Sequence, residues 1–400
     1  MSNGPLVHAP HFRARRAQNW VLLGLMYGFF YMSRYNFSAV QGEIAQRFGW
    51  SHSDYSNVLS AGLLVYGFAV FLNGPLADRI GGKRAILIGA AGASVFNLLF
   101  GLCHLFLVKP ARMVAGQVVE AAVLADGMSN ATVIATFAAL WAANHYFQSF
   151  GALSIVKINA SWFHVRERGS FAGIFGVMIQ AGRTLAFSLG PLILRFLPWQ
   201  YVFFIPALLL LVMWLTVFRF VENSPAAAGL GEYETGDQTP EEAAAPVTLS
   251  FVLRKVFTRR EPWLIALSSM CIGMVRNSID HFYVRYFTNV FHLSNAKLAA
   301  PYQIASVAMP LAAVLGGLAA GNASDRIFGS RRAPVICLAF VGQALCLLLL
   351  QRVMNDAWNG AAMLVLLSFF IQSAHSLVGG AASMDFGGRK AVATAARTRI

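Results

Sequence analysis

The segment at residues 74–84, GPLADRIGGKR, has a near copy at residues 321–332, GNASDRIFGSRR. Both copies follow a long apolar run, and both place an Asp-Arg pair four residues after a glycine. The glycines allow a tight turn and a close approach of helices. The carboxylate can cap a neighbouring helix and pair with a basic side chain, which would lock one conformation. We therefore predict two conformational-gate loops, built on Asp78, Arg79, Asp325 and Arg326.

The composition around these segments predicts a membrane protein. The 400 residues are 57% hydrophobic and only 12% charged, with a mean hydropathy of +0.58, whereas a soluble domain carries about 25% charged residues. A helix needs about 20 apolar residues to cross a bilayer. We count ten such runs, near residues 20–40, 57–77, 85–107, 131–152, 170–194, 200–220, 263–288, 302–322, 333–351 and 360–380. The expected fold class is all-α and polytopic.

The positive charges predict the topology. With the N-terminus in the cytoplasm, 21 of the 31 Lys and Arg residues fall in cytoplasmic segments and six in external ones. This distribution obeys the positive-inside rule. The net charge of +14 is therefore topological, and no nucleic-acid partner is needed to explain it. We expect a multi-pass protein of a bacterial-type inner (plasma) membrane with a cytoplasmic N-terminus.

The remaining four arginines, Arg34, Arg183, Arg276 and Arg285, lie within spans. Arg34 and Arg276 are 242 positions apart, close to the 247 that separate Asp78 from Asp325. Two unrelated pairs of residues that are separated by nearly the same number of positions indicate duplicated halves, which are typical of transporters. We assign residues 1–221 to an N-terminal six-helix bundle, 222–262 to a cytoplasmic linker, and 263–400 to a C-terminal bundle with four spans. Within the linker, residues 222–246 are expected to be flexible, and residues 247–262 to lie on the membrane surface as a basic helix.

Charges at the bilayer centre indicate function. Each costs about 2.5–3.5 kcal/mol on insertion scales, and a guanidinium presents a planar fork of donors that suits phosphate or carboxylate. Arg34 and Arg276, related by the repeat, are therefore expected to face each other across a cavity that binds an anion. The alternative is structural neutralisation, because Asp280 lies four residues after Arg276 on the same helix face.

These motifs resemble the major facilitator superfamily, which implies twelve helices in two six-helix bundles around a central substrate site. The first span, with Tyr27, Tyr31 and Arg34 followed by Asn36-Phe37, resembles the organophosphate:phosphate antiporter family. Further matching stretches are Tyr66-Gly67-Phe68, Glu167-Arg168-Gly169, Arg276 followed by Asp280, and DFGGRKA at residues 385–391. The resemblance implies that Arg34 and Arg276 bind a phosphoryl group and that Tyr27, Tyr31 and Tyr66 shape the cavity.

The sequence also departs from that family. The glycerol-3-phosphate transporters carry a lysine just after the Tyr-Gly-Phe stretch and a histidine on the fifth span, where this chain has Val70 and Ile179. We infer that Arg183, one turn further on, supplies a third positive charge. The alternative, that Arg183 pairs with backbone carbonyls or an acidic neighbour, is equally open. Asp280 and Gln148 complete the candidate substrate-binding residues, and polar residues such as Asn144, His145 and His375 either line the cavity or join helices.

The leading hypothesis is a carrier that exchanges a phosphorylated organic solute, of the sugar phosphate or glycerol 3-phosphate type, for inorganic phosphate by alternating access. No catalytic triad, Walker loop or zinc spacing is present, so we expect neither an enzyme nor a metal or cofactor, and we expect a monomer in the bilayer. One alternative is a transporter-like sugar-phosphate sensor. Another is a proton-coupled organic-anion transporter, which requires an essential carboxylate in the membrane, and Asp280 is the clear candidate.

The ten runs are two fewer than the resemblance implies. After residues 393–396 the family continues as an apolar eleventh helix, whereas this chain ends Arg397-Thr398-Arg399-Ile400. Loss of two helices would expose polar cavity walls to lipid. The expectation is a C-terminally truncated carrier with impaired transport.

Overall fold

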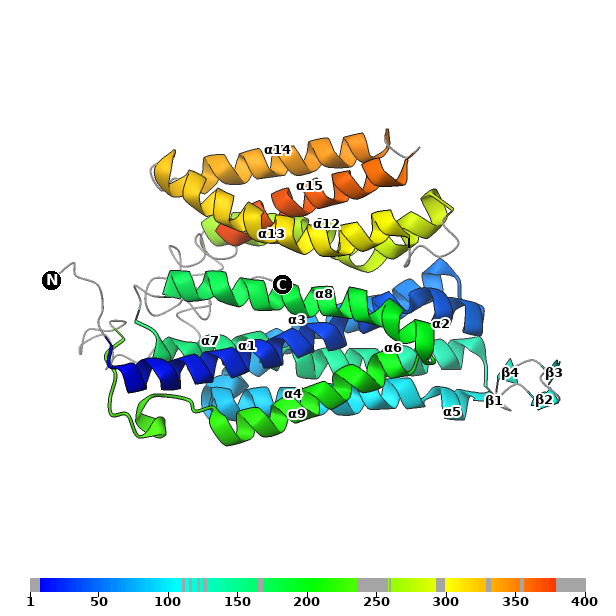
Figure 1. Cartoon of the computed structure of the whole chain (residues 1–400), viewed down its shortest axis with the longest axis horizontal. Helices are drawn as coiled ribbons and strands as arrows, with labels where there is room; N and C mark the ends of the chain where they lie inside the picture. The colour runs from blue at the N-terminus through cyan, green and yellow to red at the C-terminus, as the bar shows by residue number, and fades with distance from the viewer. Residues whose placement is uncertain are drawn as a thin grey trace. The chain divides into compact units, whose positions relative to one another are not determined.

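The computed structural model describes residues 8–109, 112–114, 117–120, 123–124, 128–164, 168–235, 258, 260–292, 299–328, 332–352 and 356–378. Long helices dominate these residues (Figure 1). The helices are α1 (Pro10–Ala39), α2 (Gln41–Phe48), α3 (His52–Ile80), α4 (Gly82–Leu102), α5 (His104–Leu107), α6 (Asn130–Gln148), α7 (Phe150–Trp162), α8 (Arg168–Phe196), α9 (Tyr201–Phe220), α12 (Arg260–Val290), α13 (Ala300–Arg326), α14 (Arg332–Leu350) and α15 (Ala357–Ser376). The helical fold class is as predicted.

Four short strands lie between α5 and α6. They are β1 (Val108–Lys109), β2 (Arg112–Val114), β3 (Gln117–Glu120) and β4 (Val123–Leu124). β1 pairs with β4 and β2 with β3, both antiparallel. The surface helix expected at residues 247–262 lies almost entirely outside the described residues, as does the 385–391 stretch.

Six helical segments among the described residues are long and apolar enough to cross a membrane. They are His52–Ala77, Gly82–Leu107, Tyr201–Phe220, Ala300–Ser324, Arg332–Leu350 and Ala357–Ser376. The count of about ten spans is therefore not confirmed. Helices α1, α8 and α12 cover three of the other expected spans, and α6 with α7 covers the fourth. α1 carries Arg34, and α12 carries Arg276 and Arg285, and these charges lower the apolarity of the segments that contain them.

The chain divides into two compact units. Unit 1 comprises residues 1–34, 50–178 and 203–237, and unit 2 comprises residues 35–49, 179–202 and 238–400. The division is not contiguous, because it assigns the C-terminal part of α1, the whole of α2 and the later part of α8 to the same unit as α12–α15. The division into bundles at residues 221 and 263 stays a prediction.

The repeated Asp-Arg motif lies at helix ends rather than in open loops. α3 continues through Pro75 to Ile80, and α13 ends at Arg326. Both Arg79 and Arg326 are exposed. The chain turns out of α3 at Gly81, whose φ of 89° favours glycine over residues with a Cβ. The turn therefore requires the glycine that the motif carries, and α4 begins directly after it.

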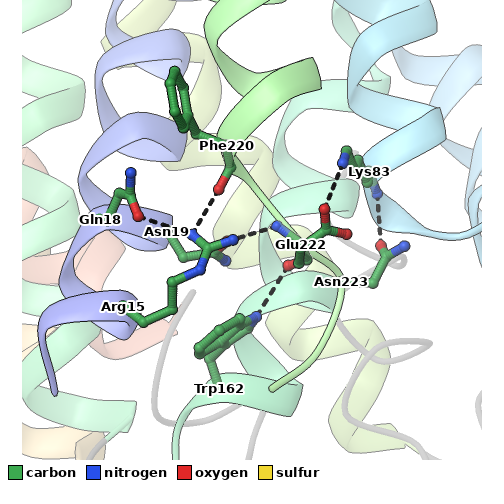
Figure 2. A network of polar contacts seen from close by, with 8 residues as sticks. All are labelled: Arg15, Gln18, Asn19, Lys83, Trp162, Phe220, Glu222 and Asn223. Carbon is green, nitrogen blue, oxygen red and sulfur yellow. Dashed lines mark hydrogen bonds and ion pairs between the residues drawn. The ribbon is translucent and has the colours of Figure 1, made fainter. Parts of the chain in front are cut away.

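The segment that follows α9 is attached to unit 1 (Figure 2). The Glu222 carboxylate accepts from Lys83 Nζ at 3.0 Å, its carbonyl accepts from Trp162 Nε1 at 3.0 Å, and its amide donates to Asn19 Oδ1 at 2.8 Å. Arg15 donates to the carbonyl of Phe220 at 2.6 Å. These bonds join α1, α4, α7 and α9, so the expectation of flexibility from Glu222 onward does not hold here.

Tyr233 extends this attachment to residues beyond Asn223. Its ring lies 4.9 Å from that of Phe12 and 5.8 Å from that of His8, measured between centroids. Phe12 in turn lies beneath the guanidinium of Arg16, which also covers Phe163 at 4.7 Å. Within the predicted linker, Tyr233 therefore contacts the N-terminal end of α1.

Asn223 supplies a cap that α4 lacks in its own sequence. Gly81 precedes α4 and has no side chain to accept from the first turn, while Asn223 Oδ1 accepts from the Lys83 amide at 2.8 Å. Loss of such a cap typically costs about 1 kcal/mol. We expect Asn223→Ala to lower the thermal unfolding midpoint of the purified protein by about 1–2 °C, and Asn223→Asp to keep it, because a carboxylate is an equally good cap. An aspartate variant as unstable as the alanine variant would contradict the capping role.

Candidate functional site

Arg34 lies in unit 1 among an amide and two aromatic rings. Its Nε donates to Gln148 Oε1 of α6 at 3.0 Å. Its guanidinium carbon lies 4.5 Å from the ring centroid of Tyr66 on α3 and 5.0 Å from that of Tyr31, one turn earlier on α1. Cation–π contacts of this kind attract a cation to the ring face. None of these three groups carries a negative charge, so they orient the guanidinium without neutralising it.

A buried row of amides extends from Gln148. Its Nε2 donates to Asn144 Oδ1 at 3.4 Å, and the same oxygen accepts from Asn97 Nδ2 of α4 at 3.0 Å. Asn144 Nδ2 donates to the carbonyl of Ser33, the residue before Arg34. All three amides are essentially inaccessible to solvent. A paired amide network in an apolar interior is rigid, because breaking it would leave unsatisfied polar groups. The network therefore fixes the position from which Arg34 extends.

Tyr27 and Tyr31 are as close as their spacing on α1 predicts. Their ring centroids are 5.1 Å apart in an edge-to-face arrangement. Tyr27 is buried and contacts Gly151 of α7, where a Cβ would lie 3.0 Å from the ring. The structure thus gathers Arg34, Tyr31, Tyr66 and Gln148, with Tyr27 behind Tyr31. Of the sequence candidates on α6, Gln148 contacts Arg34, whereas His145 faces Tyr66, with centroids 6.4 Å apart.

Arg276 lies on α12 in unit 2. Its Nη1 is 3.4 Å from Nε2 of His375 on α15. The carboxylate of Asp280, which the alternative interpretation of the sequence paired with Arg276, binds Arg183 in the structure. Because Arg34 and Arg276 belong to different units, their facing across a cavity stays a prediction.

Asp280 pairs instead with Arg183 of α8. Arg183 Nη1 lies 2.5 Å from Asp280 Oδ1, with 10% of the arginine side chain and 3% of the aspartate side chain exposed. Tyr35 donates its hydroxyl to the other carboxylate oxygen at 3.3 Å. A cavity of about 10 Å³, room for about one water, borders the pair together with Ser306 and Tyr283. Of the two readings of Arg183, the geometry fits pairing with an acidic neighbour.

His281, the residue after Asp280, receives further contacts from the C-terminal part of α1 and from α2. Its Nδ1 lies 2.5 Å from Ser38 Oγ, its ring stacks on Tyr35 with centroids 5.2 Å apart, and its carbonyl accepts from Gln41 Nε2 at 3.2 Å. The ring is buried. Sequence reasoning missed Tyr35, Ser38 and Gln41, and the signal available was their run of polar groups directly after Arg34.

The structure describes the side chains of two of the four predicted gate residues. Arg79 and Arg326 are exposed ends of α3 and α13, and the side chains of Asp78 and Asp325 lie outside the description. The basic residue of the first motif that has a defined partner is Lys83, bound to Glu222 in unit 1. A gating role for the Asp-Arg pairs stays a prediction. Across the described residues, no group of His, Cys, Asp and Glu side chains forms a metal site.

Comparison with known proteins relates the whole chain to a family of carriers. The profile of the Major Facilitator Superfamily matches residues 23–398. The glycerol-3-phosphate transporter of Bacillus subtilis is 26% identical over 398 residues, which cover 96% of this chain and 82% of that protein. A probable hexose phosphate transport protein of Chlamydia pneumoniae is 22% identical, covering 92% and 78%. The membrane sensor protein UhpC of Salmonella typhimurium is 22% identical, covering 84% and 71%.

Solved structures agree on the fold. The D-xylose-proton symporter superposes with a TM-score of 0.68 at 14% sequence identity, covering 97% of this chain and 87% of that one. A bacterial homologue of the human lysosomal transporter Spinster, in an inward-facing and unoccupied conformation, gives a TM-score of 0.67 at 13% identity, covering 98% and 80%. At such identities the likeness concerns the fold alone.

Proposed function

Because the chain belongs to the major facilitator superfamily, we propose that it carries a phosphorylated organic solute, of the sugar phosphate or glycerol 3-phosphate type, across a bacterial-type plasma membrane in exchange for inorganic phosphate. Its relatives are transporters named for glycerol 3-phosphate and hexose phosphate rather than enzymes. In this proposal the N-terminus is cytoplasmic, the protein acts as a monomer, and the two halves open the site alternately to each side.

The observation that carries the proposal is the environment of Arg34. A charged group within an apolar span indicates a functional site, and Gln148, Tyr31 and Tyr66 orient this guanidinium. An anion such as a phosphoryl group would compensate it and accept from the guanidinium fork. Arg276 beside His375 is the corresponding cation of the other half. Tyr27 and Tyr31 would contact the organic part of the solute.

Exchange follows from this charge balance. Two arginines brought together without an anion repel each other, so the empty carrier resists closing around its site. Either phosphate or the organic phosphate removes that repulsion. Conformational switching then requires one of the two anions to be bound, which couples the outward movement of one to the inward movement of the other.

A counterflow experiment tests the function directly. Purified protein is reconstituted into liposomes loaded with unlabelled inorganic phosphate, and labelled phosphate, glycerol 3-phosphate and glucose 6-phosphate are supplied outside in separate assays. We expect transient accumulation of label that requires internal phosphate. Protein-free liposomes, and liposomes loaded with chloride, are the controls. Absence of accumulation for every labelled phosphate would contradict the carrier.

The sensor alternative is retained because a relative is named a membrane sensor protein. Saturable binding of a sugar phosphate without any counterflow would favour it. The proton-coupled alternative depends on Asp280, which already binds Arg183 and Tyr35. It predicts uptake that a proton gradient drives in the absence of internal phosphate, and the same liposomes measure this.

A further inference from the structure

His375 is placed by close contact between α13 and α15, which run side by side (Figure 1). Two residues before it, Ser373 donates to the carbonyl of Gly316 at 2.9 Å. A Cβ at Gly316 would lie 2.1 Å from the carbonyl oxygen of Phe369. The two backbones are therefore in contact, and a glycine is required there because any side chain would force the helices apart. This contact leaves α15 little freedom to rotate, so the position of His375 is set by the fold.

The contact with Arg276 depends on the tautomer of the His375 ring. A guanidinium has donors and no acceptor. The 3.4 Å approach of Arg276 Nη1 to His375 Nε2 is therefore a hydrogen bond only if Nε2 has a lone pair, which requires a neutral ring with its proton on Nδ1. A protonated ring would present a donor and a second positive charge to the arginine. This contact thus selects one tautomer of a neutral histidine.

Two of the intramembrane arginines in unit 2, Arg183 and Arg276, have different partners. Arg183 is held by the carboxylate of Asp280, which both orients and neutralises it. Arg276 is oriented by an imidazole, and that contact contributes no negative charge. An arginine that must bind an incoming anion needs its direction fixed but its charge retained. A neutral hydrogen-bond acceptor such as His375 Nε2 fixes the direction without competing with the anion, as a carboxylate would.

We propose that His375 is the positioning residue for Arg276 in phosphoryl recognition. Its Nε2 accepts from one Nη1–H and thereby aims the guanidinium fork at the anion. The proposal rests on the function proposed above, since it names a further residue of the same site. The titratable and charged residues on the helices that pack against α15 come from α12, α13 and α14. They are Arg260, Glu261, Cys271, Arg276, Asp280, His281, Tyr283, Arg285 and Tyr286 on α12, Tyr302, Asp325 and Arg326 on α13, and Arg332, Cys337 and Cys346 on α14.

Substitutions that keep or remove the acceptor test this role. The amide oxygen of glutamine reaches as far as Nε2, whereas that of asparagine is one bond shorter. For inorganic phosphate binding to the purified protein, measured by calorimetry, we expect His375→Gln to stay within about threefold of wild type. We expect His375→Ala and His375→Asn to raise the Kd on the order of tenfold, the loss typical of one hydrogen bond to a charged group. In liposomes the same variants raise KM while the maximal rate changes by less than about twofold.

Controls separate positioning from structure. Ser376→Ala alters the next residue of α15. The hydroxyl of Ser376 donates to the carbonyl of Ser373 on its own helix, so this substitution should leave phosphate binding unchanged. In a protein that already carries Arg276→Gln, adding His375→Ala should not change the phosphate Kd further. Equal phosphate Kd values for the wild-type protein, His375→Ala and His375→Asn would overturn the inference while leaving the carrier intact. So would a His375→Gln variant that binds phosphate as weakly as His375→Ala. Absence of saturable phosphate binding to the wild-type protein would overturn the proposed function and this inference together.

Discussion

Replacing Arg34 by glutamine is expected to reduce phosphate-driven counterflow roughly 100-fold, because it removes a charge-assisted hydrogen bond to a desolvated anion, an interaction worth about 2–5 kcal/mol. Glutamine retains a polar group near Gln148, Tyr31 and Tyr66 but supplies neither the charge nor the fork. Arg34→Lys should recover only part of the loss, because an ammonium is a point charge without paired planar donors. Initial rates of labelled phosphate uptake into preloaded liposomes measure both variants.

Arg13 provides the matched control for Arg34. It lies on the same helix, it is exposed, and the substitution to glutamine is identical. Arg13→Gln should transport within about twofold of wild type, since an exposed charge contributes little. Size-exclusion profiles and thermal midpoints of the purified variants establish that each is folded. Uptake by Arg34→Gln within threefold of wild type would remove Arg34 from the binding site and with it the main support for an anion carrier.

Replacing Asp280 by leucine is expected to destabilise the protein by about 3–5 kcal/mol, because it leaves Arg183 buried without its carboxylate. The thermal unfolding midpoint of the detergent-solubilised protein should fall by roughly 5 °C. The double variant Arg183→Met/Asp280→Leu should recover most of that loss, because removing both charges together removes the desolvation penalty as well. Tyr35 would lose an acceptor in either case, so the comparison isolates the ion pair.

The ion pair of Lys83 and Glu222 is the control for Asp280. Its side chains are 17% and 29% exposed, and exposed pairs contribute about 0–1 kcal/mol. Lys83→Met should therefore shift the midpoint much less than Asp280→Leu. Transport by the double variant also decides the role of Arg183. Retained uptake would assign Arg183 to structure, as its geometry indicates. A thermal unfolding midpoint of the double variant as low as that of Asp280→Leu would contradict the pairing argument.

Several features could be predicted because they are local properties of the sequence. An apolar run, an excess of basic residues on one side and a charge within a span each carry a transfer free energy that does not depend on the rest of the fold. The offset shared by the Asp-Arg motifs and by Arg34 and Arg276 needs only residue numbers. These observations indicated a helical transporter, and the motifs resembled the major facilitator superfamily, which the comparisons confirm.

Partners within the site could not be predicted in the same way. Helical spacing offered Asp280 to Arg276, four residues away, yet the carboxylate binds Arg183, 97 positions earlier in the chain. Gln148 lies 114 positions after Arg34, and His375 lies 99 after Arg276. A residue on a helix reaches its i+4 neighbour only if no better partner faces it from another helix, and which helix faces it depends on packing.

The sequence by itself therefore determined the fold class, through the free energy of placing residue types in a membrane, and the family, through the resemblance of its motifs. It also supplied Arg34 and Arg276 as candidate site residues. Only the tertiary structure decided that Asp280 neutralises Arg183, that Arg276 lies beside His375, and that the segment after α9 is bound to α1, α4 and α7. Those outcomes depend on distances between helices, and such distances are set by close packing at positions such as Gly316 that carry no charge.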